Sequence, residues 1–212
     1  MSPMADPQRC GDDQWLRAYF EQYQALLFQL DVCEQLRRLA GLLEGARATG
    51  RKVILAGNGG SAAIASHCAV DFTKAARVRS INFNEADLIT CFANDYGYEH
   101  WLERAIEYYA DPEDVAILIS ASGKSSNMLN AARAAADKGL TVVTLTGFAP
   151  DNPLRALGRL NLWVDSRAYN IVEMTHHIWL LAVCDLLAAA ADRRATRARR
   201  EAVPAAAGDP GP

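Results

Sequence analysis

The stretch Val53-Ile-Leu-Ala-Gly-Asn-Gly-Gly-Ser61 decides the fold, together with the segment Ala62-Ala-Ile-Ala-Ser-His67-Cys-Ala-Val-Asp71 that follows it. An apolar run breaks into a glycine-rich turn that ends in a serine, and an alanine-rich helix then carries His67 and Asp71 four residues apart. A buried strand, a flexible turn and a helix start bring unpaired backbone N–H groups and the positive end of a helix dipole to one point. Such a point favours an anion, and we expect a phosphate there.

After Gly50, short apolar runs alternate with helical patterns. The runs are rich in β-branched residues and mostly apolar on both faces, which is typical of strands that are covered on both sides. The expected strands are 53–56, 80–83, 115–119, 141–145 and 160–164. The expected helices between and after them are 61–76, 98–109, 125–138 and 171–191. This alternation predicts an α/β fold with a doubly wound parallel sheet, whose ligand binds at the carboxyl ends of the strands.

The N-terminal part has a helical pattern. From Asp12 to Ala48, apolar residues recur every three or four positions, which predicts one long amphipathic helix or two in series. Packing against a second subunit would bury this stripe, so we expect a homo-oligomer. Residues 12–191 are expected to form a single domain that includes an oligomerisation helix over 12–48. Residues 1–11 are expected to be a flexible leader, and 192–212 a disordered tail rich in Arg, Pro and Ala.

Composition narrows the functional classes. The chain has 212 residues and a formal net charge of -3, which gives no general electrostatic attraction to nucleic acid; the basic exception is the arginine cluster of residues 193–200 in the tail. No run approaches the roughly 18 to 20 apolar residues of a membrane helix, because even Ile178 to Ala191 is short and contains Asp185. The N-terminus also lacks a signal-peptide pattern. We therefore expect a cytoplasmic protein with no membrane or nucleic-acid partner.

A second loop shares the chemistry of the first. Ser120-Ala-Ser-Gly-Lys-Ser-Ser126 follows the strand at 115–119 and opens the next helix, which gathers hydroxyls and backbone N–H groups at one strand end. Taken singly, each loop has a simpler explanation: glycine turns permit positive φ angles, and Ser125 or Ser126 could be only a helix N-cap. Two such loops together favour a phosphomonoester site.

Nucleotide-binding motifs are absent. Leu118 stands where the nucleotide P-loop would need its first glycine, and Ala62 stands where the dinucleotide fingerprint would need its third. A small phosphorylated ligand is therefore expected, with no nucleotide cofactor.

These motifs resemble the sugar isomerase (SIS) domain family, specifically its phosphoheptose isomerase branch. The resemblance covers about residues 12 to 190 and is carried by Gly57–Ser61 with His67, Asn94-Asp-Tyr-Gly97, Ile119–Ser125 and Thr144–Gly147. It implies a three-layer α/β/α sandwich with a five-stranded parallel sheet and a homotetramer held partly by the N-terminal helices. It also implies interconversion of sedoheptulose 7-phosphate and D-glycero-D-manno-heptose 7-phosphate. The expected substrate-binding residues are Asn58, Gly59, Ser61, Asp95, Ser120, Ser122 and Ser125.

Moving a carbonyl between C1 and C2 of a sugar phosphate requires one group for the proton on carbon and another for the proton on oxygen. A carboxylate and a histidine suit this task, since their pKa values can be tuned towards neutrality. His67 and Asp71 share a helix face at spacing i,i+4, and Glu173 and His177 share one on the last helix. The sequence alone leaves open whether the two helices meet.

The resemblance implies a zinc ion between these helices, held by a histidine and a glutamate on the first and by a glutamine and a histidine on the last. His67 matches the first histidine, while Asp71 replaces the glutamate and Glu173 replaces the glutamine. Leucine stands at the position of the catalytic histidine, as Leu181 or, without a one-residue shift, as Leu180.

We therefore hypothesise that His177 supplies the missing imidazole and forms the catalytic pair with Asp71. Zinc or another divalent ion is an open possibility, with His67, Asp71, Glu173 and His177 as its ligands. The alternative function is a non-catalytic SIS-domain protein of the replication-initiator-binding type, which binds sugar phosphate or acts as a scaffold; the leucines favour this reading.

Overall fold

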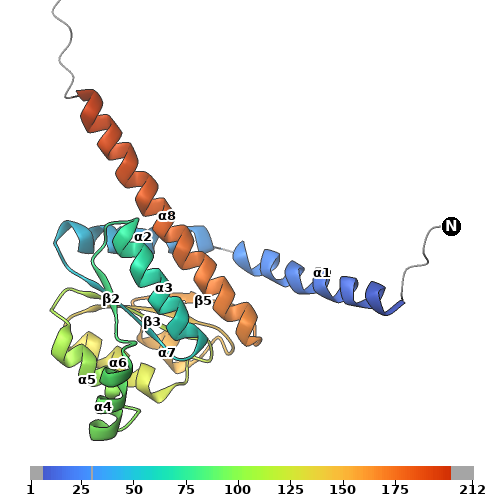
Figure 1. The fold of residues 1–212 in the computed structure, drawn as a ribbon, viewed down its shortest axis with the longest axis horizontal. Helices are drawn as coiled ribbons and strands as arrows, with labels where there is room; N and C mark the ends of the chain where they lie inside the picture. The colour runs from blue at the N-terminus through green and yellow to red at the C-terminus, as the bar shows by residue number, and fades with distance from the viewer. Residues whose placement is uncertain (1–6, 30, 202–212) are drawn as a thin grey trace, which may run out of the picture.

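A computed structural model of the chain describes residues 7–29 and 31–201. Its centre is a parallel sheet with the strand order β2-β1-β3-β4-β5 (Figure 1). Each strand falls within one of the five expected runs or extends it by one residue, so the predicted α/β class with a five-stranded parallel sheet is confirmed. The strands are β1 Val53–Gly57, β2 Ser80–Asn82, β3 Val115–Ser120, β4 Thr141–Thr146 and β5 Leu160–Trp163.

Helices cover both faces of the sheet, which explains why the strands are apolar on both sides. Within β1, Val53 and Leu55 pack into one hydrophobic cluster, while Ile54 and Ala56 pack into the other. The first cluster includes helices α2 Val32–Ala48, α3 Gly60–Lys74 and α8 Tyr169–Glu201. The second includes α5 Trp101–Tyr109, α6 Ser126–Asp137 and α7 Pro153–Leu157, with α4 Ala86–Tyr96 packed against it. The result is the expected α/β/α sandwich.

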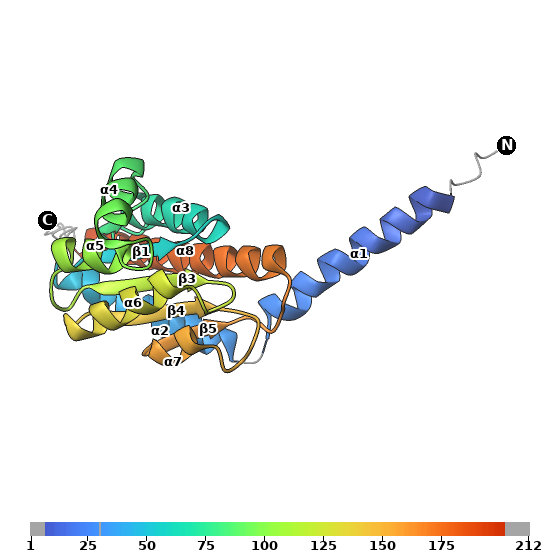
Figure 2. The same cartoon turned by 90° about the horizontal axis from the view of Figure 1, so that it is seen from below.

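The N-terminal pattern forms two helices in series, α1 Pro7–Leu27 and α2. Helix α1 begins inside the predicted leader 1–11, of which residues 1–6 lie outside the described part of the chain. Figure 2 shows α1 extending away from the sandwich. Near its C-terminal end, the Tyr23 hydroxyl donates to the carbonyl oxygen of Asn170 at 3.2 Å, which connects α1 to the start of α8. Aromatic side chains of α1 stay exposed, with Trp15 and Phe20 each 64% accessible.

Helix α8 is longer than expected. It continues from the predicted 171–191 to Glu201 and so extends into the expected tail 192–212, of which residues 202–212 lie outside the described part of the chain. Alanine and arginine are strong helix formers, which allows the helix to continue beyond the core.

One segment of α8 does have the length and composition of a membrane span, contrary to the sequence-based expectation. Within the described residues, Tyr169–Arg193 is the one such candidate, with a mean hydropathy of 1.4. One face of it packs into the first hydrophobic cluster, where Trp179, Leu180 and Val183 are at most 2% exposed, while Ile178 and Leu186 on the other face are 44% and 41% exposed. This segment is the core helix of the first layer.

Candidate active site

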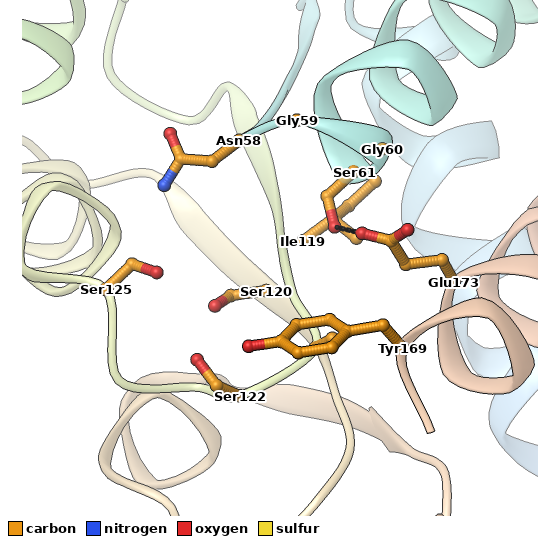
Figure 3. Close-up of a pocket in the computed structure, with 11 residues that line it drawn as sticks. Asn58, Gly59, Gly60, Ser61, Ile119, Ser120, Ser122, Ser125, Tyr169 and Glu173 are labelled. Atoms are coloured by element: carbon orange, nitrogen blue, oxygen red, sulfur yellow. Dashed lines mark hydrogen bonds between the residues drawn. The ribbon is translucent and has the colours of Figure 1, made fainter. Parts of the chain in front are cut away.

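A cavity of about 360 Å³ lies at the carboxyl ends of β1 and β3 (Figure 3). The chain order reverses here, since β2 lies beyond β1 and β4 lies beyond β3, and ligands bind at such a switch point in open α/β sheets. Every expected substrate-binding residue except Asp95 lines the cavity. The lining residues are Asn58, Gly59, Gly60, Ser61, Ile119, Ser120, Ala121, Ser122, Ser125, Tyr169 and Glu173.

The hydroxyl-rich loop forms one side of this cavity. Ser120 ends β3 and is 6% exposed, and Ser122 follows it in the turn. Ser125 occupies the N-cap position of α6, yet its side chain makes no capping hydrogen bond and borders the cavity. Ser125 is therefore the N-cap residue by position, and its hydroxyl borders the cavity at the positive end of α6, where an anion would bind.

Asn58 is held by residues that sequence reasoning missed. Its Nδ2 donates to Oδ1 of Asn127 at 3.0 Å, and Nδ2 of Asn127 donates back to Oδ1 of Asn58 at 2.9 Å. The Tyr98 hydroxyl donates to the same Asn58 oxygen at 3.1 Å. Asn127 is 2% exposed, so this reciprocal pair fixes the amide of Asn58 at the rim of the cavity. The sequence signal was weak: an asparagine in the first turn of the helix after the second loop.

Helices α3 and α8 do meet, and they meet at Glu173. The Ser61 hydroxyl donates to Oε1 of Glu173 at 3.1 Å (Figure 3). The rest of the carboxylate lies against Gly60, where a Cβ would overlap it. Tyr169, another residue that sequence reasoning missed, lines the cavity one turn before Glu173 and packs its ring edge-on to Phe148, with centroids 4.8 Å apart.

The two histidines and Asp71 form a row farther along the same helices. Nε2 of His177 lies 2.9 Å from Nδ1 of His67, and Nε2 of His67 lies 3.2 Å from Oδ2 of Asp71. With both rings neutral, one proton arrangement satisfies both contacts: His177 donates to His67, and His67 donates to Asp71. Burial, with repulsion from His67, lowers the pKa of His177 below its ordinary value. None of the three residues lines the cavity.

The expected metal ligands are not assembled. Among the residues that the structure describes, no three His, Cys, Asp or Glu side chains come together to hold a metal ion. Glu173 turns to Ser61, and the facing nitrogens of His67 and His177 bond each other, so the four donors do not converge on one point. The residues of one chain therefore do not fit the metal, and no chemical step is assigned to it.

Asp95 is the one predicted substrate-binding residue that lies apart from the cavity. Residues up to Tyr96 belong to α4, and Gly97 follows the helix with a φ of 87°. Asp95 is exposed there and accepts a hydrogen bond from Nδ2 of Asn94 at 2.9 Å. It does not reach the cavity lining.

Comparison with known proteins finds similarity to the SIS domain family and to phosphoheptose isomerases. Residues 18–147 match the family model of the SIS domain. The chain is 31% identical over 180 residues to a phosphoheptose isomerase of Syntrophotalea carbinolica, which covers 81% of this chain and 91% of that protein. It is 36% identical over 162 residues to a phosphoheptose isomerase of Streptomyces coelicolor, and the match covers 74% of this chain and 68% of that protein. The solved structure of phosphoheptose isomerase GmhA from Neisseria gonorrhoeae superposes with a TM-score of 0.77 at 25% identity, covering 83% of this chain and 97% of that one.

Proposed function

The chain belongs to the SIS domain family, in its phosphoheptose isomerase branch, and from this premise we propose that it interconverts sedoheptulose 7-phosphate and D-glycero-D-manno-heptose 7-phosphate. The observation that carries the proposal is the composition of the cavity at the switch point. It combines a loop of three serines with a carboxylate, which are the groups that a phosphorylated sugar and a proton transfer require.

The phosphate end of the substrate is assigned to the loop between β3 and α6. Ser120, Ser122 and Ser125 offer hydroxyl donors, and the N-terminus of α6 contributes its positive dipole end. Lys124 is exposed and does not line the cavity, so the serines and backbone groups of this loop carry the binding.

The row His177–His67–Asp71 is proposed to manage the protons on the sugar oxygens. His177 lies one helical turn beyond Glu173 on α8, on the same face. Its lowered pKa keeps the ring neutral at neutral pH, so that it can accept a proton. When it does, His67 and Asp71 share the resulting charge through the two hydrogen bonds of the row. The catalytic pairing of His177 with Asp71 remains a prediction.

We further propose a cytoplasmic homotetramer. Support comes from α1, which extends from the sandwich (Figure 2). Its side chains Trp15 and Phe20 are each 64% exposed, and Leu16 is 45% exposed. Isolated surface helices of this kind are stabilised by burying their apolar face against another subunit. Light scattering on the full chain and on the double variant Trp15→Glu, Phe20→Glu checks this, since a tetramer that depends on α1 should dissociate.

The test of function is incubation with sedoheptulose 7-phosphate in deuterated water, followed by NMR. Isomerisation predicts formation of the aldose and incorporation of deuterium at the carbon that exchanges its proton. A Ser125→Ala variant should raise KM about tenfold, in line with the loss of about one hydrogen bond to a charged group.

The alternative is the non-catalytic SIS protein. It is favoured by Leu180, which is buried in the core, and by Leu181, which packs against it, because neither can move a proton. Binding of the sugar phosphate with neither isomerisation nor exchange would select this alternative.

A further inference from the structure

We propose that Glu173 is the base that carries the proton between C1 and C2 of the substrate, a role that rests on the proposed isomerase function. The resemblance to the phosphoheptose isomerases implies a glutamine at this position, which cannot accept a proton. Glu173 puts a carboxylate there, which can accept one.

The first argument is position. Glu173 is the one carboxylate among the residues that line the cavity, and the remaining lining residues are serines, glycines, an asparagine, a tyrosine and apolar side chains. Asp71, the base expected from sequence, lies outside the cavity and is engaged with His67. A general base must come within hydrogen-bond reach of the proton that it removes, so geometry favours Glu173.

The second argument is the way the carboxylate is held. Oε1 accepts the proton of the Ser61 hydroxyl, and Ser61 itself is only 3% exposed, so this contact is fixed by the protein. The carboxylate also lies beside Gly60, the first residue of α3, where the helix dipole stabilises a negative charge. A carboxylate has about four lone-pair sites and Ser61 occupies one, which leaves capacity for a substrate proton.

The third argument is the arrangement of the cavity. Figure 3 shows Ser122 and Ser125 on the side of the cavity away from Glu173, with Ser120 between them and the Ser61–Glu173 pair. In a heptulose 7-phosphate the phosphate and the C1–C2 unit are at opposite ends of the carbon chain. A phosphate bound by Ser122 and Ser125 therefore directs the carbonyl end towards Glu173.

The step balances without any further reagent. The Glu173 carboxylate takes the proton from C1 of the ketose, the electron pair of the C1–H bond forms the C1=C2 double bond, and the carbonyl oxygen on C2 gains a proton to give an enediol. In the second half the hydroxyl on C1 loses its proton and becomes the carbonyl, and C2 takes the proton back from Glu173. The proton that the C2 oxygen gains is balanced by the one that the C1 hydroxyl loses, so water in the cavity carries both and no further acid or base is consumed.

The decisive variant is Glu173→Gln, which preserves shape and the Ser61 contact but removes the base. We expect kcat and deuterium incorporation to fall at least 100-fold, within the range of general acid–base catalysis. The affinity for heptitol 7-phosphate, a substrate analogue with no carbonyl, should change less than threefold, because the phosphate loop is untouched. The matched control is Asp185→Asn, an exposed carboxylate on the same helix, which should leave both measurements unchanged.

The outcomes separate this proposal from the one on which it rests. If the wild-type protein neither isomerises nor exchanges any ketose phosphate, the isomerase function fails and the role of Glu173 fails with it. If the wild-type protein is active and Glu173→Gln keeps kcat within threefold, only the role of Glu173 is overturned. An equal loss of heptitol phosphate affinity and of rate would also overturn it, since that result describes a binding residue.

Discussion

The carboxylate of Glu173 packs directly on Gly60, so that a Cβ at residue 60 would overlap Oε2. The overlapping atoms are at the end of a flexible side chain, and the backbone around residue 60 would not have to move. Gly60→Ala should therefore fold normally while displacing the carboxylate from the cavity, and we expect kcat to fall about 10- to 100-fold. Steady-state kinetics with a thermal melt checks both parts.

Gly45→Ala provides the control for that substitution. Gly45 lies on the exposed side of α2, where an added Cβ would have nothing within 4 Å, and alanine should stabilise the helix by roughly 0.5–1 kcal/mol. Unchanged kinetics in Gly60→Ala would show that the position of the carboxylate is unimportant.

Asn127→Ala should raise KM about tenfold with a smaller effect on kcat. The substitution removes two of the three hydrogen bonds that orient the Asn58 amide at the rim of the cavity and leaves only the one from the Tyr98 hydroxyl, so the substrate must order a looser side chain. Asn130→Ala, on the same helix but outside the cavity, is the comparison. Equal KM values for the two variants would contradict the positioning role of Asn127.

NMR titration of His177 should give a pKa below the ordinary histidine value. Burial is the largest cause and the charge of His67 adds to it, while Asp71 opposes both by attracting the protonated ring. Asp71→Asn should therefore lower the pKa further, and His67→Gln should raise it. An unchanged titration in both variants would mean that the row is not formed in solution.

The fully buried His176 should make the fold sensitive to acid. Burial lowers its pKa to about 4, although the ring nitrogen Nε2 bonds the carbonyl oxygen of Thr146 at 3.0 Å. Between pH 4 and the ordinary pKa of about 6.5, the unfolded chain binds the proton and the folded chain does not, so stability falls as the pH falls through this window. His176 alone should cost about 2 kcal/mol between pH 7 and pH 5. Urea unfolding at both pH values measures this cost, and His176→Gln should remove it.

Asp114→Ala should destabilise the fold without affecting the chemistry. Asp114 is 1% exposed, lies 2.7 Å from the Lys52 ammonium and accepts the backbone N–H groups of Lys52 and Asp111. Removal of one partner from such a buried pair costs about 3–5 kcal/mol, which urea unfolding measures.

The Asp114 carboxylate lies beside the amino end of β3, at the opposite end of the strand from the cavity. The kcat of the folded Asp114→Ala protein should therefore not change. Glu113→Ala, which removes the exposed pair with Arg51, should cost less than about 1 kcal/mol. A large effect of Glu113→Ala would indicate that the surface ion pair matters more than the buried one.

The sequence by itself determined the sheet, the two loops and their convergence. Apolar runs on both strand faces, glycine between strand and helix, and serines at a helix start are local patterns with local physical causes, so the bounds of β1 and β3 and the places of Ser61, Ser120 and Ser125 follow from them.

Only the tertiary structure decided which titratable groups enter the site. A spacing of i,i+4 shows that His67 and Asp71, or Glu173 and His177, share a helix face, but the surroundings of that face depend on how α3 packs on α8. The packing puts Glu173 into the cavity beside Ser61, pairs His67 with His177 outside it, and leaves Asp95 on an exposed helix end. The contacts between Ser61 and Glu173 and between His67 and His177 join residues more than a hundred positions apart, so no local pattern encodes them.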